Sequence, residues 1–348
     1  MMVLTAPFPY FGGKSRIARD IWARLGNVPN FVEPFFGSGA VLLARPHPPG
    51  VETVSDADHF VSNFWRAVQS DPDAVAHYAD WPVNETDLEA THYWLVTKGA
   101  ARIAGIEGDP MAYDAQVAGW WLWGICIWIG HGFCTGKGSW WWDGKAWRDD
   151  ATGVGINRQL PHLSDAGTGI SRALPHLGNP GKGINRQLTP GVARTEYIRS
   201  LMLALADRLR DVRVCAGDWS RVCTPALTCK RWLTGVFLDP PYSADADRCA
   251  DVYATDSDTV AVEVRKWAIT QGANPLMRIA FCGYEDEYEF PPDWEVLRWK
   301  GYGGYGNQGN GRGRANAARE TVWFSPHCLN TDTLFKDAEP GDDPGKGE

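Results

Sequence analysis

The sequence divides into two stretches of alternating strands and helices, which a long segment of different character separates. In the first stretch, apolar runs predict buried strands at Asn30–Glu33 and Val51–Ser55, and amphipathic patterns predict helices at Ser38–Ala44 and Ala57–Gln69. Strands joined by helices pair in parallel, because each helix carries the chain back to where the next strand begins. This alternation predicts an α/β fold with an open, mostly parallel sheet and helices on both faces.

The second stretch continues the alternation after residue 195. Its expected elements are a helix at Glu196–Arg210, strands at Val212–Cys215, Gly235–Leu238 and Arg278–Cys282, and a helix at Thr259–Thr270. Two final strands, Trp294–Trp299 and Glu320–Phe324, flank a glycine-rich loop and are expected to form an antiparallel pair. In open sheets of this kind, ligands bind beyond the carboxyl ends of the strands. Functional residues that follow these strands are therefore expected to meet in one cleft.

The segment between the two stretches, residues 71–194, is predicted to be an inserted domain within a discontinuous one, which comprises residues 1–70 and 195–328. A short unit that starts at Gly155 recurs from Gly169 and, truncated, from Gly183, so residues 155–188 repeat with a period of 14. This period is too short for the usual solenoid units. Glycine and proline within the unit argue against a continuous helix, so we expect a looped, stacked or extended arm.

Tryptophan is concentrated in the insert, which holds eight of the 18 tryptophans between residues 120 and 147. We expect four of them to form the core of a helix pair: Trp120, Trp121, Trp123 and Trp128. The run Trp140–Trp142 lies beside glycines and is expected at a hairpin tip. There Trp141 would be placed to stack on bases or wedge into a duplex.

Composition excludes several classes of protein. No apolar run approaches the ~20 residues of a membrane span, and the N-terminal residues lack the pattern of a signal peptide. The eight cysteines form no C-x-x-C pair and have no histidine at zinc spacing. We therefore expect reduced thiols, no metal site and no membrane association, as in a cytoplasmic protein.

The net charge of −8 argues mildly against nucleic-acid binding, but the charges are segregated. Between Val296 and Arg319 there are five basic residues and no acid. The acids gather partly in the final residues, 329–348, which are expected to form a disordered acidic tail. Net charge alone therefore does not exclude a nucleic acid as partner.

The strongest single motif is Asp239-Pro240-Pro241-Tyr242, which directly follows a predicted strand. Two consecutive prolines fix the backbone and leave carbonyl groups without neighbouring N–H donors. Such a turn would aim the Asp239 carboxylate and the Pro240 carbonyl into the cleft, beside the flat ring of Tyr242. Two acceptors beside an aromatic ring suit a planar base that carries an amino group. An ordinary Pro-Pro turn would not require the flanking acid and aromatic residue.

A second motif follows the first strand, where Glu33, Pro34 and Phe35 precede two glycines, Gly37 and Gly39, that lead into a helix. Glycines let the chain turn tightly and let a ligand approach the backbone. The loop lacks the third spaced glycine of a phosphate-binding fingerprint. It therefore favours a nucleoside-type cofactor without a pyrophosphate.

Two further acids follow strands. Asp56 is placed to accept hydrogen bonds from ribose hydroxyls, although Asp56 or the nearby Asp58 would also serve as a helix N-cap. Asp218 precedes Trp219 at the corresponding position after a later strand. It would either meet an adenine amino group, with Trp219 against the ring, or act only as a cap, and the sequence leaves both open.

A fourth motif lies near the N-terminus, where Tyr10 is followed by a glycine turn, Gly12 and Gly13, and by Lys14. The turn presents a cation close to the start of an amphipathic helix. Such a cation suits a carboxylate of the ligand.

Together these motifs resemble the Dam-type DNA adenine-N6 methyltransferases, the alpha arrangement of amino-methyltransferases. The shared pattern is a Gly-Gly-Lys segment, a Glu-Pro-Phe-x-Gly-x-Gly loop, a target-recognition insert and then Asp-Pro-Pro-Tyr, all in this order here. The resemblance covers roughly Pro7–Gln69 and Glu196–Pro326. It implies a Rossmann-like methyltransferase sheet with S-adenosyl-L-methionine as cofactor. Positions that match cofactor-contacting ones are Tyr10, Lys14, Asp56 and Asp239.

The resemblance also implies the reaction, which is methylation of the exocyclic amino group of an adenine flipped out of double-stranded DNA. Asp239 to Tyr242 match the catalytic motif, and no metal is required. A cognate restriction endonuclease and a bacterial or phage origin are suggested by the resemblance alone, and the oligomeric state is open. The chain departs from the family at Tyr10 and Phe11, where Trp and Ala are common, and in its insert, which lacks the usual recognition patterns.

The expected DNA contacts lie in the insert and in the glycine-rich loop. The repeats place an arginine at constant spacing, and the glycine-rich loop adds two more: Arg158, Arg172, Arg186, Arg312 and Arg314. These suit phosphate contact, but a solvated repeat and a plain hairpin connection explain them as well. Two rival functions also remain, namely methylation of cytosine in DNA or guanine in RNA by the same fold, and DNA binding by a non-catalytic relative.

Overall fold

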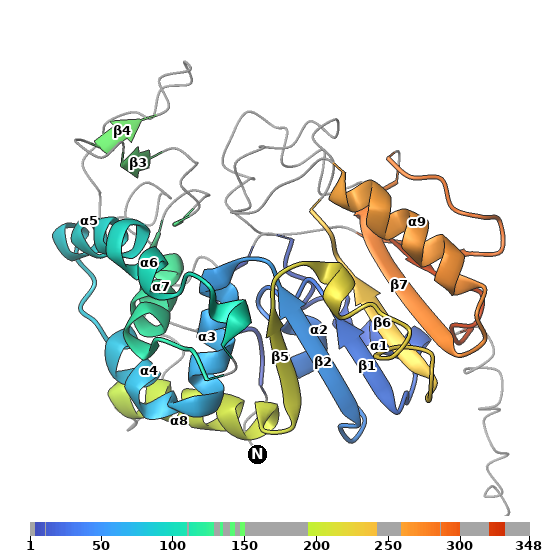
Figure 1. The fold of residues 1–348 in the computed structure, drawn as a ribbon, viewed down its shortest axis with the longest axis horizontal. Coiled ribbons are helices and arrows are strands. Elements are labelled where there is room, and N and C mark those ends of the chain that lie inside the picture. Colours follow the sequence, from blue (N-terminus) through green and yellow to red (C-terminus); the bar gives the residue numbers. More distant parts are fainter. Residues whose placement is uncertain are drawn as a thin grey trace, which may run out of the picture.

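The computed structural model describes residues 4–10, 12–109, 111–128, 133–134, 140–142, 147–149, 194–241, 259–285, 287–299 and 320–330. Its centre is a seven-stranded sheet, whose parallel strands stand side by side in Figure 1. In spatial order the strands are β5 (Val212–Ala216), β2 (Val51–Asp56), β1 (Asn30–Glu33), β6 (Thr234–Leu238), β7 (Met277–Tyr284), β9 (Glu320–Phe324) and β8 (Glu295–Arg298). The first five are parallel, whereas β9 runs antiparallel to both β7 and β8. The predicted mostly parallel sheet and its final antiparallel pair are confirmed.

Helices surround the sheet. In chain order they are α1 (Ala18–Leu25), α2 (Ala40–Leu43), α3 (His59–Ser70), α4 (Pro72–Ala79), α5 (Glu85–Trp94), α6 (Ala100–Arg102), α7 (Ala115–Ile127), α8 (Arg194–Leu209) and α9 (Val260–Gly272). Short turns of tighter or wider helix occupy Leu95–Gly99, Ile106–Gly108 and Trp219–Arg221. None of the helices in the described ranges is long and apolar enough to cross a membrane.

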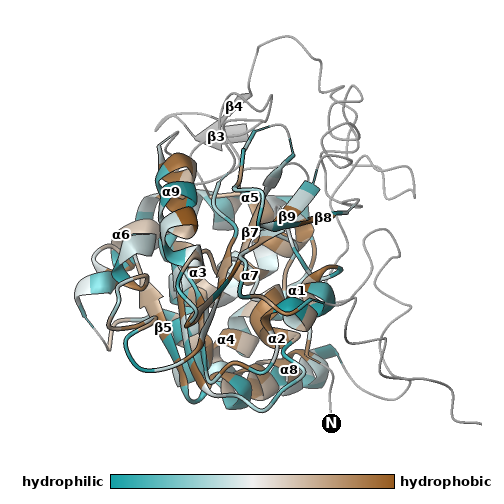
Figure 2. Cartoon of the chain, turned by 90° about the vertical axis from the view of Figure 1, so that its right-hand side faces the viewer, coloured by the Kyte–Doolittle hydropathy of each residue, from teal (hydrophilic) through white to brown (hydrophobic). Residues whose placement is uncertain are grey.

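Successive residues of the central strands point to opposite faces of the sheet, and each face has its own hydrophobic cluster. Phe31 of β1 and Phe237 of β6 belong to the cluster shared with α1, α3 and α8. Their neighbours Val32 and Val236 belong to the cluster covered by α9. Figure 2 shows α9 with both brown and teal stretches, as expected for a helix that buries one side. Strands buried on both faces explain why the sequence shows continuous apolar runs rather than alternation.

The tryptophan-rich helix α7 lies within the same core as the sheet. It packs against α3 and α4, and α4 packs against α8. Trp121 is 1% exposed, with its ring centroid 4.9 Å from that of Phe8 and 6.1 Å from that of Phe64 in α3. The expected helix core is confirmed for α7, with Trp123 also buried and with Trp120 and Trp128 partly buried against the cluster. The division of the chain into two domains stays a prediction.

The run Trp140–Trp142 differs from the expectation. It forms strand β3, which pairs antiparallel with β4 (Trp147–Asp149), so the tryptophans form one side of a hairpin instead of its tip. Because Trp142 pairs with Trp147, the connection between the two strands comes after the tryptophans and not within them. The 14-residue repeats at 155–188, the glycine-rich loop at 302–314 and most of the tail lie outside the described residues.

A pair of tryptophan variants tests whether α7 belongs to the core of the sheet. We expect Trp121→Ala to lower the free energy of unfolding by about 3–5 kcal/mol, because it leaves a cavity between α7, α3 and Phe8. Trp232→Ala, at a side chain that is 53% exposed, should change it by no more than ~0.5 kcal/mol. Urea unfolding followed by circular dichroism measures both. Equal effects of the two variants would contradict this packing.

Candidate functional site

The candidate site lies beyond the carboxyl ends of the central strands. Glu33 ends β1, Asp56 ends β2, and Asp239 directly follows β6, which pairs with β1 on the side opposite to β2. The order of the sheet reverses between β1 and β6, because the chain first builds outward through β2 and β5 and then continues on the other side of β1. Such a switch point is where open α/β sheets bind ligands.

One pocket at this point brings most of the predicted residues together. Its lining includes nearly all of the predicted cofactor residues, namely Tyr10, Gly12, Gly13, Lys14, Glu33, Pro34, Phe35, Gly37, Asp56, Asp218 and Asp239. Pro241 of the predicted catalytic motif also lines it. Gly39 and Pro240 do not border the pocket, and Pro240 is buried. Tyr242 lies outside the described residues.

An ion pair joins the N-terminal motif to the catalytic motif. The Lys14 ammonium lies 2.8 Å from Oδ2 of Asp239, which is 225 residues away in the sequence. Lys14 also donates to the carbonyl oxygen of Gly12 at 2.6 Å. Its turn is closed by a hydrogen bond from the Gly13 N–H to the Tyr10 carbonyl at 3.1 Å. The two motifs therefore face each other, as the hypothesis of one shared cleft requires.

The same contacts revise the role expected for Lys14. Its side chain is 2% exposed, and its ammonium is directed at protein acceptors. Burial alone would lower the pKa of Lys14, but the negative charges of Asp239 and Glu320 raise it above its ordinary value. Lys14 thus stays protonated, and the charge that it provides in this structure holds Asp239. Contact with a ligand carboxylate stays a prediction.

The glycine loop after β1 has a backbone that only glycine adopts easily. Gly37 and Gly39 have φ angles of +45° and +69°. A Cβ atom on Gly37 would lie 2.7 Å from the Tyr10 ring, and one on Gly39 would lie 3.0 Å from the rings of Phe36 and Trp65. The Trp65 indole N–H donates to the Gly37 carbonyl at 2.8 Å. The loop is therefore fixed by aromatic side chains from three segments, of which sequence reasoning identified Tyr10 but not Trp65.

Asp56 organises this loop as well as lining the pocket. Its Oδ2 accepts a hydrogen bond from the Gly37 N–H at 2.8 Å, and its Oδ1 accepts one from the Asp58 N–H at 2.9 Å. Burial raises the pKa of Asp56 to about 7, and the charge of Asp58 adds to the shift while the backbone donors oppose it. Each carboxylate oxygen has a further lone pair, so Asp56 can still accept from a hydroxyl group. Asp58 accepts from the Phe60 N–H at 2.8 Å and caps α3, which the sequence had left as an alternative.

Glu33 is the most deeply buried acid of the site, with 2% of its surface exposed. Its Oε2 accepts a hydrogen bond from the Leu42 N–H of α2 at 3.2 Å. Burial raises the pKa of Glu33 well above its ordinary value, and the charges of Asp239 and Glu52 act in the same direction. A protonated Glu33 keeps a donor as well as an acceptor at the base of the pocket.

Asp218 acts as a helix N-cap, which is one of the two roles that the sequence left open, and it also borders the pocket. Its Oδ1 accepts hydrogen bonds from the N–H and the hydroxyl of Ser220, which caps the short helix Trp219–Arg221. Trp219 lines the pocket and packs against Trp267 of α9, with ring centroids 6.0 Å apart. The cap accounts for one oxygen of Asp218, so its contact with an adenine amino group stays a prediction.

Several lining residues carried no signal in the sequence. Val260 begins α9 and Phe237 belongs to β6, and both reach the pocket only because the sheet brings them there. Glu320 of β9 helps to raise the pKa of Lys14, although it follows no recognisable motif, and Cys282 of β7 lies close to the same charges. Burial raises the pKa of the Cys282 thiol well above its ordinary value, with the charge of Asp239 acting in the same direction, so the thiol is neutral. A buried neutral thiol is not a nucleophile.

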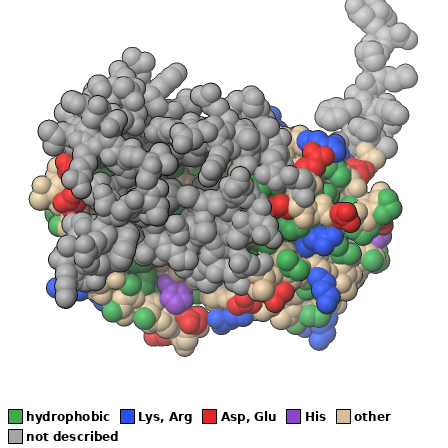
Figure 3. Space-filling model, turned by 90° about the horizontal axis from the view of Figure 1, so that it is seen from above, with side chains coloured by type: hydrophobic (Ala, Val, Ile, Leu, Met, Phe, Trp, Pro, Cys, Tyr) green, Lys and Arg blue, Asp and Glu red, His purple; other side chains and the backbone are tan. Residues whose placement is uncertain are grey.

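The predicted DNA contacts cannot be placed in this site. Trp141 lies in β3, and its side chain is not described, while Arg158, Arg172, Arg186, Arg312 and Arg314 lie outside the described residues. The described side chains around the rim of the view in Figure 3 mix Lys and Arg with Asp and Glu. Among the residues that the structure describes, no group of His, Cys, Asp and Glu could hold a metal ion.

A glycine pair tests the geometry of the loop. Gly105 also has a positive φ, +78°, but a Cβ there would meet no atom within 4 Å. We expect Gly105→Ala to lower the free energy of unfolding by the backbone strain alone, about 1–2 kcal/mol. Gly39→Ala should cost a further ~1–3 kcal/mol, because its methyl group would press on Phe36 and Trp65. Urea unfolding compares the two variants, and a Gly39→Ala variant no less stable than Gly105→Ala would contradict the loop geometry.

A comparison with known families gives a match to the N-terminal part of this arrangement. The model of the D12 class N6 adenine-specific DNA methyltransferase family matches residues 10–108, which begin at Tyr10 and include Lys14, the glycine loop and Asp56. The match also extends beyond α3 through α5 and α6. Curated proteins give no match to the chain. The match confirms the resemblance predicted from the motifs over residues 10–108, where the chain is similar to the D12 class N6 adenine-specific DNA methyltransferase family.

Proposed function

We propose that this chain transfers the methyl group of S-adenosyl-L-methionine to the exocyclic amino group of an adenine that is flipped out of double-stranded DNA. The observation that carries the proposal is the ion pair between Lys14 and Asp239 within the pocket at the sheet's switch point. It joins the two motifs that the resemblance assigns to cofactor and base. The family match supports adenine as the target and DNA as the substrate.

The pocket residues fit the proposed cofactor. S-adenosyl-L-methionine, when bound, supplies a methyl group activated by a sulfonium charge. The pocket is lined by five carboxyl groups and one lysine: Glu33, Asp56, Asp58, Asp218, Asp239 and Lys14. An acidic lining suits a ligand that carries a sulfonium and an ammonium group, because opposite charges attract strongly in a partly buried site. The glycine loop leaves room for the ligand beside the backbone, and Trp219 and Phe35 offer apolar faces for a nucleoside base.

Asp239 would bind the amino group of the adenine. Lys14 holds Oδ2 of Asp239, and because a carboxylate oxygen can accept more than one hydrogen bond, Asp239 would still accept an N–H of the base. The Pro240 carbonyl would accept the second N–H, and Tyr242 would stack on the ring. These acceptors would draw the nitrogen lone pair out of conjugation and toward the methyl group. The methyl group would pass from sulfur to nitrogen, leaving a neutral thioether, and the gain would come from positioning and from charges fixed in advance. A strong general base is unnecessary, because the methylated nitrogen is positively charged and loses its extra proton readily to water.

The remaining parts of the proposal concern the rest of the chain. Residues 71–194 would recognise the target sequence, with Trp141 and the repeat arginines near the DNA. Residues 1–70 and 195–328 would carry out the transfer. The protein would act in the cytoplasm of a bacterium. A cognate endonuclease would make the protein part of a restriction-modification pair. The same fold acting on cytosine is the second candidate, because Asp-Pro-Pro-Tyr suits any amino group on a planar ring.

An Asp239 variant tests the proposed chemistry. We expect Asp239→Asn to reduce methyl transfer by about 10²–10³-fold, because an amide binds the amino group less strongly and points one N–H at a donor. The amide oxygen keeps an acceptor for Lys14, so the fold should be retained. Transfer of a labelled methyl group to unmethylated plasmid DNA measures the rate, and mass spectrometry of the nucleosides identifies the product.

The exposed variant Asp207→Asn is the matched control and should retain full activity. Full activity of Asp239→Asn would refute the proposed role of this carboxylate. Methylcytosine as the product would favour the second candidate, and cofactor binding without any methylated base would indicate a non-catalytic relative.

The raised pKa of Asp56 predicts a pH dependence of cofactor affinity. If ribose hydroxyls donate to the ionised carboxylate, binding favours the form that has lost its proton. Below the pKa of about 7 the proton must be displaced, so affinity should rise with pH and level off above about 7. Calorimetric titration with S-adenosyl-L-methionine between about pH 5.5 and 8.5 measures this. Asp56→Asn should bind more weakly but with a flat profile, and a profile unchanged from the wild type would argue against Asp56 as the titrating group.

A further inference from the structure

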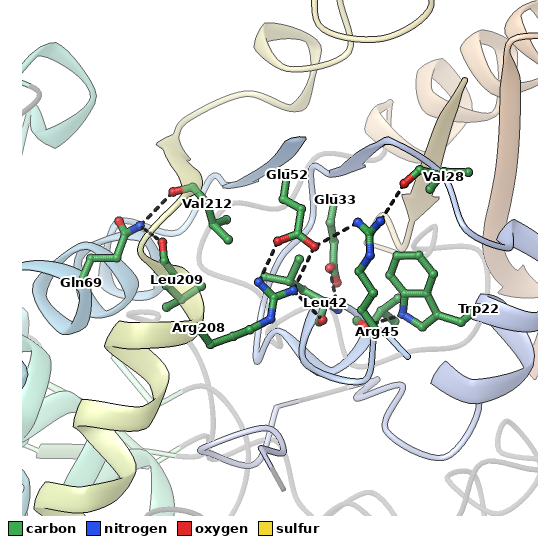
Figure 4. A network of polar contacts seen from close by, with 11 residues as sticks. Trp22, Val28, Glu33, Leu42, Arg45, Glu52, Gln69, Arg208, Leu209 and Val212 are labelled. Atoms are coloured by element: carbon green, nitrogen blue, oxygen red, sulfur yellow. Dashed lines mark hydrogen bonds and ion pairs between the residues drawn. The ribbon is translucent and has the colours of Figure 1, made fainter. Parts of the chain in front are cut away.

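The four-residue helix α2, which begins directly after the glycine loop, is held by side chains from other elements (Figure 4). The Leu42 N–H donates to Glu33 at 3.2 Å, and the Leu42 carbonyl accepts from Nη2 of Arg208 at 3.2 Å. The Val41 carbonyl accepts from the Trp22 indole N–H at 2.7 Å. A helix this short is unstable alone. The N–H groups of Ala44 and Arg45 close its last turn by donating to the Val41 and Leu42 carbonyls at 3.2 Å, and the three side chains join this turn to other elements.

Arg208 is itself fixed by a buried carboxylate. Its Nη1 and Nη2 lie 2.7 and 2.9 Å from the two oxygens of Glu52, which is 2% exposed. Such a bidentate contact fixes the orientation of the guanidinium and pairs its charge with that of the carboxylate. Arg45 completes the arrangement, since its Nη1 contacts Glu52 at 3.1 Å and its guanidinium lies 5.0 Å from the Trp22 ring centre. Glu52 thus binds both Arg45, which precedes it in the sequence, and Arg208, which follows it by 156 residues.

We propose that Arg208 is a positioning residue for the cofactor, which it serves by fixing α2 and, through Leu42, the buried Glu33. Glu33 lines the pocket, and Leu42 is bonded to Glu33 on one side and to Arg208 on the other. Arg208 lies in α8, outside the family-matched segment and far from every motif in the sequence. This inference rests on the proposed function for the identity of the ligand but not for the contacts.

The loss of Arg208 would remove its hydrogen bonds to the Leu42 carbonyl and to both oxygens of Glu52. The Arg45 N–H would still donate to the Leu42 carbonyl at 3.2 Å, and the Arg45 guanidinium would still contact Glu52 at 3.1 Å, but the link to α8 would be lost. The end of α2 would then move, and the Glu33 carboxyl and the glycine loop would no longer be held where the cofactor requires them. The reacting atoms near Asp239 are held separately, by Lys14. A defect in cofactor affinity with little change in the rate of the bound complex is therefore the signature of this role.

The test uses the full chain with Arg208→Gln and Arg208→Lys. We expect the Kd for S-adenosyl-L-methionine, measured by calorimetry, to rise about tenfold in Arg208→Gln, while kcat at saturating cofactor stays within about twofold of the wild type. Arg208→Lys should recover little of the affinity, because one ammonium group cannot reach both Glu52 oxygens and the Leu42 carbonyl. An unchanged Kd in Arg208→Gln would overturn the proposal.

Two control variants separate positioning from a general loss of stability. Arg199→Gln removes an arginine from the same helix whose partner is the exposed Asp73, 2.7 Å away, and should leave Kd unchanged. Trp121→Phe loosens the core without touching α2. If its Kd rises as much as that of Arg208→Gln at a comparable loss of stability, the effect is general and the proposal fails.

Hydrogen exchange without cofactor distinguishes this proposal from the proposed function. In Arg208→Gln the amides of residues 37–44 should exchange faster than in the wild type, whereas those of β6 should not. If the wild type binds no S-adenosyl-L-methionine, the proposed function fails, and faster exchange would still support the link from Arg208 to α2. Unchanged exchange at residues 37–44 would refute that link whatever the ligand.

Discussion

The parallel pairing of β1 with β6 is the interaction on which the site depends. Asn30 pairs with Thr234 in the sheet, and the Asn30 side-chain amide donates to the Thr234 hydroxyl at 2.9 Å, across 204 residues of sequence. Asn30 also donates to the Leu227 carbonyl at 2.8 Å. Because the register is fixed at this end, the two strands finish side by side, with Glu33 and Asp239 at the same edge. A slip of one residue would turn Phe31 and Phe237 out of their cluster, so the hydrophobic core also fixes the site.

The charges of the pocket follow from that convergence. The strand ends bring Glu33, Asp56 and Asp239 close together, and Lys14 is the one cation among the described residues that line the pocket. The raised pKa values of Glu33 and Asp56, which burial causes first and neighbouring acids increase, show that the protein does not stabilise all of these carboxylates as anions. A cationic ligand would lower those pKa values as it binds, and the resulting attraction favours it over a neutral ligand of the same shape. The neutral thioether left after methyl transfer would lose this part of the attraction.

Much of the sheet was predictable because most strands contain a short run of apolar residues, such as Gly235–Leu238, that ends at an acid or a turn. The helix after Gly39 is shorter than predicted, since the left-handed backbone of Gly39 delays its start and Leu43 ends it. The cap at Asp58 was one of two alternatives that local sequence allows, and only the coordinates decide between them. The Lys14–Asp239 and Arg208–Glu52 contacts were not predictable, because they join residues far apart whose individual types are common on any protein surface. The contact of Trp65 with the glycine loop was likewise not predictable, since Trp65 lies within an ordinary amphipathic helix.

The chain between α3 and α8, residues 71–193, belongs to the connection between β2 and β5, which are neighbours at one end of the sheet. Its exit and return are tied together, because Arg194 at the start of α8 pairs with Asp80 at 2.7 Å, and Gln69 of α3 donates to the carbonyls of Leu209 and Val212 at 2.6 and 2.8 Å. Because these contacts hold the two ends of the connection together, a longer connection costs only a slowly growing loop-closure entropy. Helices α4 and α7, which belong to this connection, pack beside α3 and add to the hydrophobic cluster on one face of the sheet.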